Sequence, residues 1–266
     1  MIACALLSTW RSFPMAQPRF YCSHPLQSGD HFVLSEALAR HAVKVLRLEA
    51  GDALILFDGL GGEYTAHIES VSSGEVRVKV HGHLDREVES PLNIWLGQAL
   101  CATEKMDWVL QKAVELGVSR CTPLNARRSV VRLTTERGQK REQHWLKVVQ
   151  SACEQSGRNR VPQVDSVWDL ERWNAALPEG VTKLLLSPDG NISLTGLARP
   201  SCSVAIMVGP EGGWSQEECR WAEKAGFQSI RLGPRVLRTE TAALALISVL
   251  QARWGDFSGE RGAEPL

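Results

Sequence analysis

The sequence has little of what marks membrane-spanning, secreted or metal-dependent proteins. Its longest apolar stretch, residues 242–250, is nine residues long and contains Ser248, whereas a helix that spans a bilayer needs about 20 residues. The seven cysteines occur singly, without a C-x-x-C pair or a histidine at zinc-ligand spacing. We therefore expect reduced thiols, no metal site and a cytoplasmic setting. The first apolar run follows no basic residue and is too short for a signal peptide, so residues 1–17 are interpreted as an extension without a folded role.

The sequence also lacks an excess of charge of either sign, because Lys plus Arg equal Asp plus Glu at 30 each. Bulk electrostatics therefore cannot attract a polyanion, and any attraction must be local. Residues 120–160 hold ten basic and three acidic side chains, a net charge of +7, whereas residues 49–90 hold nine acidic and three basic side chains. A basic face for nucleic acid and two solvated faces of opposite sign both fit this segregation.

The composition indicates a globular protein of two domains. Hydrophobic residues at 44%, charged residues at 23%, 22 glycines and 12 prolines argue against disordered, collagen-like and coiled-coil chains. Hydrophobic cores tend to divide as chains approach 266 residues. The acidic, proline-containing segment 89–91 is the expected boundary, between a first domain at residues 18–88 and a second at residues 91–255. Residues 256–266 are expected to form a tail.

The two predicted domains differ in their hydrophobic periodicity. In the first, short alternating segments broken by glycine turns predict a small β-barrel or sandwich, and only residues 35–48 look helical. In the second, strands alternate with helices, which predicts an α/β domain with a mainly parallel sheet. The expected strands are residues 92–96, 118–124, 181–187, 203–208 and 227–232. Four helices are expected in this domain. Two of them carry apolar stripes, at residues 106–114 and 145–152. The third begins at a capping box of Ser215 and Glu218, and the fourth spans residues 240–254 after a Thr239 cap.

Two glycine-proline loops follow predicted strands of the second domain, at residues 208–214 and 232–241. Loops at the carboxyl ends of strands in open α/β sheets bind ligands. Neither loop matches a dinucleotide or P-loop fingerprint, and Glu211 would repel an anion, so a neutral or cationic ligand suits them better. Trp214 is a plausible ligand contact there, whereas Trp108 and Trp145 lie near apolar stripes and are expected in the core. The alternative is that both loops are only tight turns.

Other polar segments allow both functional and structural interpretations. Residues 127–129, Arg-Arg-Ser, are of the kind that contact RNA phosphates, but they also fit a strand edge protected by charge. Residues 154–158, Glu-Gln-Ser-Gly-Arg, fit an ordinary helix that ends at a glycine. No histidine accompanies a nucleophile motif, so a hydrolase triad is not supported.

Four motifs in order, at residues 104–118, 154–158, 209–213 and 232–242, resemble the RsmE family. These are small-subunit (16S) ribosomal RNA uridine-N3 methyltransferases of the SPOUT, or α/β-knot, class. The resemblance covers residues 19–254 and departs from the family at the residues before Met15 and at residues 101–103. It implies a PUA-like β-barrel that grips RNA, an α/β SPOUT domain with a trefoil knot around S-adenosylmethionine, and a homodimer. The last helix, apolar on more than one face, is the expected dimer contact.

Residue by residue, the resemblance also implies where ligands bind. The cofactor residues would be Leu186, Gly209, Glu211, Gly212, Leu232, Gly233, Val236, Leu237 and Arg238. The basic charge, and not the resemblance, indicates the RNA contacts: 16S ribosomal RNA or the small subunit would meet Arg127, Arg128 and Ser129, with Arg19 and Arg47 in the first domain.

The chemistry expected of such an enzyme assigns roles to three residues. A uridine that loses its N3 proton gains negative charge on its carbonyl oxygens, which a guanidinium stabilises, first Arg238 and second Arg158. Glu240 is the expected proton acceptor, although a carboxylate also suits a helix N-terminus. Two rival functions remain, an RNA-binding ribosome-assembly protein with an inactive methyltransferase domain and a nucleotide-dependent enzyme on another α/β sheet. The absence of a P-loop or Rossmann fingerprint counts against the second of these.

Overall fold

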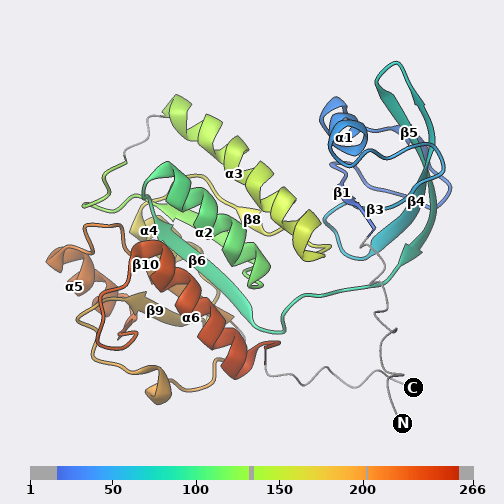
Figure 1. Cartoon of the computed structure of the whole chain (residues 1–266). Coiled ribbons are helices and arrows are strands. Elements are labelled where there is room, and N and C mark those ends of the chain that lie inside the picture. Colours follow the sequence, from blue (N-terminus) through green and yellow to red (C-terminus); the bar gives the residue numbers. More distant parts are fainter. Residues whose placement is uncertain (1–16, 132–134, 202, 258–266) are drawn as a thin grey trace, which may run out of the picture. The chain divides into compact units, whose positions relative to one another are not determined.

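The computed structural model describes residues 17–131, 135–201 and 203–257 (Figure 1). They form two compact units, and the boundary in the sequence falls between Arg86 and Glu87. Residues 1–16 of the expected extension lie outside the described residues, and so do residues 258–266 of the expected tail. Within the described ranges, no helix combines the length and the apolar character that a bilayer crossing requires.

The first unit is built on one five-stranded sheet. Its strands are β1 (Arg19–Tyr21), β2 (His31–Val33), β3 (Ala53–Phe57), β4 (Glu63–Ser72) and β5 (Glu75–Leu84), in the order β1-β3-β4-β5-β2. Only β1 and β3 are parallel, and the other neighbours are antiparallel. Along β5, Val76, Val78 and Val80 are buried while Arg77 is exposed, which is the period-two pattern of a strand with one face on the core.

The single helical stretch expected in this unit is shorter than the sequence predicted. It consists of α1 (Glu36–Arg40), capped by the Ser35 hydroxyl, and a π-helical segment, η1 (His41–Val45). The helix ends before Arg47, which has a positive φ of 57°. Arg47 therefore belongs to a turn and not to the predicted helix at residues 35–48.

The second unit contains a six-stranded sheet in which every pair of neighbours is parallel, so the prediction of a mainly parallel sheet is confirmed. The strands are β6 (Asn93–Ala99), β7 (Arg120–Leu124), β8 (Gln163–Val164), β9 (Thr182–Leu186), β10 (Ser203–Val208) and β11 (Gln228–Ile230), in the order β11-β9-β10-β6-β7-β8. Every residue of β10 is buried, as expected of a central strand with layers on both faces.

Helices cover both faces of this sheet. Helices α2 (Thr103–Glu115), α3 (Thr135–Ser156) and α6 (Thr239–Trp254) lie side by side on one face, with α2 between the other two (Figure 1). Helices α4 (Leu170–Ala176) and α5 (Gln216–Lys224) pack on the other face, where Trp173 and Ala222 join Ala205 and Met207 in one apolar cluster. A short 3-10 helix, η2 (Leu194–Gly196), follows β9.

Two details of the helices differ from the predictions, namely the exposure of Trp108 and the role of Thr239. Trp145 is buried as expected, but Trp108 is 44% exposed. At 100° per residue, Trp108 points about 200° away from Met106 and Leu110 of the buried stripe, so it lies on the solvent side of α2. Thr239 does not cap α6 with its side chain. It is the first residue of the helix, and its hydroxyl binds Gln98 and the Gly209 carbonyl.

Candidate active site

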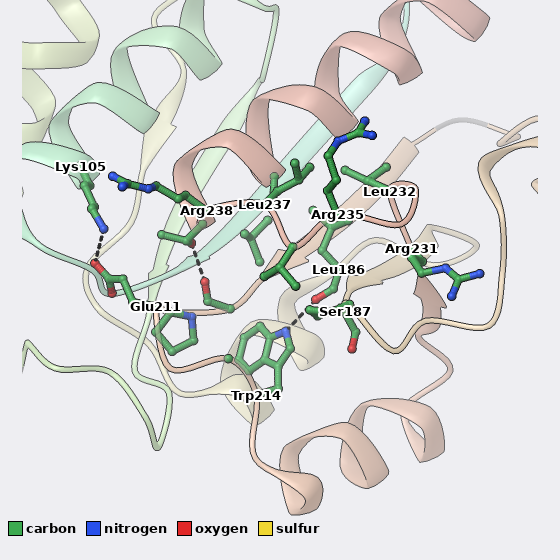
Figure 2. A pocket seen from close by; sticks show the side chains of 18 residues that line it. Lys105, Leu186, Ser187, Glu211, Trp214, Arg231, Leu232, Arg235, Leu237 and Arg238 are labelled. Atoms are coloured by element: carbon green, nitrogen blue, oxygen red, sulfur yellow. Dashed lines mark hydrogen bonds and ion pairs between the residues drawn. The ribbon is translucent and has the colours of Figure 1, made fainter.

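The two glycine-proline loops meet at the carboxyl ends of β9, β10 and β11, where they enclose a cavity of about 320 Å³ (Figure 2). Seven of the residues that the resemblance implied for the cofactor line it, namely Leu186, Gly209, Glu211, Leu232, Val236, Leu237 and Arg238. The sequence had also marked Trp214 and Thr239, which line it as well. Of the remaining lining residues, Val208, Pro210, Gly213 and Arg235 lie in the two loops that the sequence marked, and Lys105 and Ala242 lie in the motifs of the resemblance. Ser187, Pro188 and Arg231 were not predicted.

Trp214 ties the walls of the cavity together. Its indole Nε1 donates a hydrogen bond of 3.1 Å to the Leu186 carbonyl at the end of β9. A Cβ on Gly209 would lie 3.1 Å from the same nitrogen. Glycine at this position therefore lets the backbone after β10 approach the indole closely.

Two predicted glycine contacts are not part of this cavity. Gly212 faces the other way, because a Cβ there would lie 3.1 Å from Arg128 Cβ, and its carbonyl accepts a hydrogen bond from the Arg128 guanidinium. Gly233 instead lines a second, neighbouring cavity. Its φ of +73° shows that a turn requires the glycine.

A carboxylate and an ammonium meet at one side of the cavity. Glu211 Oε1 accepts 3.2 Å hydrogen bonds from Lys105 Nζ and from the Ala102 backbone N–H. Burial would raise the pKa of Glu211, but its own backbone N–H, Ala102 and Lys105 outweigh burial and hold that pKa below its ordinary value. Glu211 is therefore an ionised group at neutral pH, suited to a cationic ligand.

The predicted proton acceptor, Glu240, lies behind this pair. Its Oε2 is 3.8 Å from Lys105 Nζ, is buried, and has no hydrogen-bond partner among the described residues. Glu240 does not line the cavity. A ligand in the cavity thus meets Glu211 and Lys105 before it meets Glu240.

The position of Lys105 in its helix is itself a signal of a functional role. It lies in the first turn of α2, where the positive end of the helix dipole disfavours a cation. The ion pair with Glu211 offsets this unfavourable position.

The arginines predicted for catalysis occupy different environments. Arg238 is exposed and lines the cavity on the side of Lys105 (Figure 2). Arg158 is 4% exposed, and its guanidinium binds Glu89 and the carbonyls of Val114 and Val118. Its catalytic assignment is therefore corrected. It is a buried structural arginine that ties the start of this unit to the end of α2.

The residues predicted to contact RNA differ in their exposure. Arg127 and Arg128 are exposed, although Arg127 pairs with Glu217 and Arg128 donates to the Gly212 carbonyl, whereas Ser129 is 6% exposed. In the first unit Arg19 pairs with the buried carboxylate of Glu63, while Arg47 is exposed. Ser129 in particular is too buried to reach a phosphate as expected. Arg132, which contributes to the +7 segment, lies outside the described residues.

Comparison with known proteins adds two family matches. Residues 88–251 match the family described as RNA methyltransferase domain, and residues 34–80 match the family described as RNA methyltransferase PUA domain. The first match covers most of the second unit and the second lies within the first unit.

Two curated relatives of the chain have the same name. The chain is 34% identical to ribosomal RNA small subunit methyltransferase E of Buchnera aphidicola subsp. Schizaphis graminum, over 91% of this chain and 98% of that protein. It is 30% identical to the protein of the same name from Bacillus subtilis, over 85% and 91% of the two chains.

Two similar solved structures are also methyltransferases. The Neisseria gonorrhoeae ribosomal RNA small subunit methyltransferase E, bound to S-adenosylmethionine, is 40% identical with a TM-score of 0.85, over 91% of this chain and 99% of that one. A methyltransferase of Legionella pneumophila, in complex with the same cofactor, is also 40% identical, with a TM-score of 0.87 over 90% and 99%.

Proposed function

Because the chain belongs to the RNA methyltransferase family whose curated members are named ribosomal RNA small subunit methyltransferase E, we propose that it methylates N3 of a uridine in 16S ribosomal RNA with S-adenosylmethionine. The observation that carries the proposal is the cavity itself. It lies at the carboxyl ends of parallel strands and combines an ionised carboxylate, Glu211, with an exposed guanidinium, Arg238.

The residues of the cavity fit S-adenosylmethionine. The side chains of Leu186, Leu232 and Leu237 offer apolar surface for an adenine ring, and the Glu211 carboxylate suits a cation. The loops offer no glycine-rich phosphate cradle, which agrees with a ligand that has no phosphate. When bound, the cofactor supplies a methyl group on a positively charged sulfur. We propose the seven cavity-lining residues of the predicted set as its contacts.

Arg238 is the proposed stabiliser of the reacting base. N3 of uracil carries a proton, and its loss places negative charge on the two flanking carbonyl oxygens. A guanidinium at the cavity can donate hydrogen bonds to one of them, and such a donor acts most strongly when the charge develops. The base must also leave its stack to enter the cavity, which is easiest in single-stranded or loop RNA.

Two carboxylates compete for the role of proton acceptor. Glu240 has an unpartnered buried oxygen, whereas Glu211 lines the cavity. If Glu240 accepts the proton, Glu240→Gln lowers the rate of methyl transfer at saturating cofactor and higher pH restores it. If Glu211 does, Glu211→Gln shows that pattern and Glu240→Gln does not. Single-turnover transfer across a pH series distinguishes the two, with cofactor affinity measured separately for each variant.

The function itself is tested by mapping methylated uridines in ribosomal RNA of a strain that lacks the gene. We expect one uridine of 16S RNA to lose its N3 methyl group and the purified protein to restore it with S-adenosylmethionine. A protein that binds the RNA and the small subunit but restores no methyl group would instead be the ribosome-assembly factor with an inactive domain.

The family also implies finer features, which we propose here. These are a trefoil knot in the second unit, a barrel-like PUA fold in the first, a homodimer and a cytoplasmic location. The PUA match supports RNA binding by the first unit. The partly exposed apolar side chains of α6, among them Leu244 and Val249, support a dimer contact.

A further inference from the structure

The loop between β11 and α6 carries three arginines that have no ion pair or side-chain hydrogen bond in the described part of the chain. Arg231, Arg235 and Arg238 are all exposed, and all three line the main cavity. Figure 2 shows that they spread apart, with Arg238 on the side of Lys105 and Arg231 on the opposite side. Arg127 and Arg128, by contrast, are engaged within the protein.

The cofactor does not account for this charge. The cavity lining contains four cationic side chains, Lys105 and the three arginines, against one carboxylate, Glu211. S-adenosylmethionine has a single carboxylate beside an ammonium and a sulfonium, so its own net charge is positive. This excess of positive charge favours an additional anionic partner at the mouth of the cavity.

A second cavity, of about 300 Å³, lies on the other side of Arg231. It is lined by the polar side chains of Asn191 and Ser193, the guanidinium of Arg231, and by Gly190, Ile192, Gly233 and Pro234. No carboxylate lines it, since the neighbouring Asp189 does not contribute to its walls. Arg231 is the one residue that lines both cavities.

The wall of the second cavity is held in place by backbone pairing. Ile192 N–H donates to Ser229 O and Arg231 N–H donates to Ile192 O, at 3.1 and 3.2 Å, so the segment after β9 runs beside the end of β11. Gly190 is needed for this approach, because a Cβ there would lie 2.5 Å from the Ile230 carbonyl carbon. The cavity is therefore a formed feature of the fold and not a gap between free loops.

We propose that the second cavity is the subsite for the nucleotide next to the target uridine, and that Arg231 binds the phosphodiester that joins the two. The inference rests on the proposed function. The target uridine enters the main cavity beside the cofactor, and Arg231 stands between that cavity and the second one. The Arg231 guanidinium would therefore face the phosphodiester that links the uridine to its neighbour. The planar guanidinium matches two phosphate oxygens, and Asn191 and Ser193 offer hydrogen bonds to a ribose or a base.

The test compares Arg231→Gln with Arg220→Gln, which removes the same charge from the exposed surface of α5. The substrate is small-subunit ribosomal RNA that lacks the modification. For Arg231→Gln we expect the KM for RNA to rise about 10-fold, with a much smaller change in kcat and in the calorimetric Kd of S-adenosylmethionine. The slope of log affinity against log salt should become shallower by roughly 0.7, the value for one phosphate of a single strand.

Conservative variants separate phosphate binding from a structural role. Arg231→Lys should recover part of the affinity and the full salt slope, because it keeps the charge but loses the planar fork. Asn191→Ala and Ser193→Ala should raise the KM without changing the salt slope. An Arg231→Gln enzyme with the KM and salt slope of Arg220→Gln would overturn the proposal.

Failure of the proposed function would be visible first, because the wild-type protein would then methylate no ribosomal RNA. In that case the same variants are compared by the binding of single-stranded uridine oligonucleotides, measured by fluorescence anisotropy over a salt series. Equal affinity and equal slope of wild type and Arg231→Gln would then reject the subsite.

Discussion

At the scale of single residues, the guanidinium of Arg238 has the strongest claim to a chemical role. We expect Arg238→Ala to lower the rate of methyl transfer by about 100-fold, as the loss of one fixed donor to a developing oxyanion does. The Arg238→Lys variant should keep little of the methyl-transfer rate, because an ammonium does not reproduce the planar guanidinium fork. Single-turnover assays measure the rate, and Arg199→Ala, an exposed arginine that does not line the cavity, is the control. Wild-type turnover of Arg238→Ala would remove the residue from the mechanism.

The pair of Lys105 and Glu211 makes cofactor affinity depend on pH. The pKa of Glu211 is lowered from 4.5, so its carboxylate is present above that folded-state pKa and is lost as the pH falls through it. We expect S-adenosylmethionine affinity to be level near neutral pH and to fall only below pH 4.5. Lys105→Met removes two of the interactions that lower this pKa, so the fall should begin at higher pH.

Calorimetry of cofactor binding at several pH values measures this shift. Lys112→Met is the matched control, since Lys112 is a lysine of the same helix that pairs with Glu115 away from the cavity. Identical pH profiles for wild type and Lys105→Met would contradict the assigned electrostatics.

Single residues of the site were predictable only in part. Glu211 and Arg238 followed from the loop motifs, and both line the cavity. Gly212 belongs to the same motif but faces Arg128, because a motif does not reveal which side of a turn faces the ligand. Arg158 was misassigned because its partner Glu89 is 69 residues away in the chain, and no local pattern signals such a pair.

At the scale of the helices and strands, periodicity was a better guide. The buried stripe of α2 and the capping box of Ser215 and Glu218 were both predicted and are confirmed. These features depend on residues within one or two turns of each other. The replacement of an α-helix by η1, with its π-helical hydrogen bonds, was not predictable from a pattern of apolar positions.

Strand β6 offers a test of how closely the sheet and α4 pack. A Cβ on Gly97 would lie 2.7 Å from a ring carbon of Trp173 and 2.8 Å from Leu124 Cδ1, and both side chains are fully buried. We expect Gly97→Ala to reduce the free energy of unfolding by roughly 1–3 kcal/mol, the usual cost of overpacking. Urea unfolding measures it.

The control for Gly97→Ala is a second glycine of the same unit. A Cβ on Gly138 of α3 meets nothing within 4 Å, so Gly138→Ala should leave stability unchanged or raise it by up to about 1 kcal/mol. A neutral Gly97→Ala would show that Trp173 can shift.

At the scale of the whole molecule, the sequence predicted two domains with different secondary structure, and the chain forms two compact units. The sequence also placed the basic charge in residues 120–160. The unpartnered guanidiniums around the cavity lie at residues 231–238 instead, because pairing with distant carboxylates decides which charges remain available. A net charge counted along the chain does not contain that information.

The oligomeric state is also a property of the whole molecule, and it can be tested. We expect a two-fold dimer at micromolar concentration, with the partly exposed apolar side chains of α6 in the interface. Leu244→Glu should shift the equilibrium to monomer in sedimentation velocity, because it places a charge in an apolar contact. Lys224→Glu on α5 is the control. A monomeric wild type that retains activity would refute the dimer.

The hydroxyl of Thr239 joins the first strand of its unit, through Gln98, to the loop after β10, through Gly209. Gln98 and Thr239 are 141 residues apart in the sequence, and Lys105 and Glu211 are 106 residues apart. Contacts of such separation form late in folding, because closure of a long chain segment precedes any gain from them. We therefore expect the cavity to form after the folding transition state, so a ligand that binds it should slow unfolding and leave the rate of refolding unchanged.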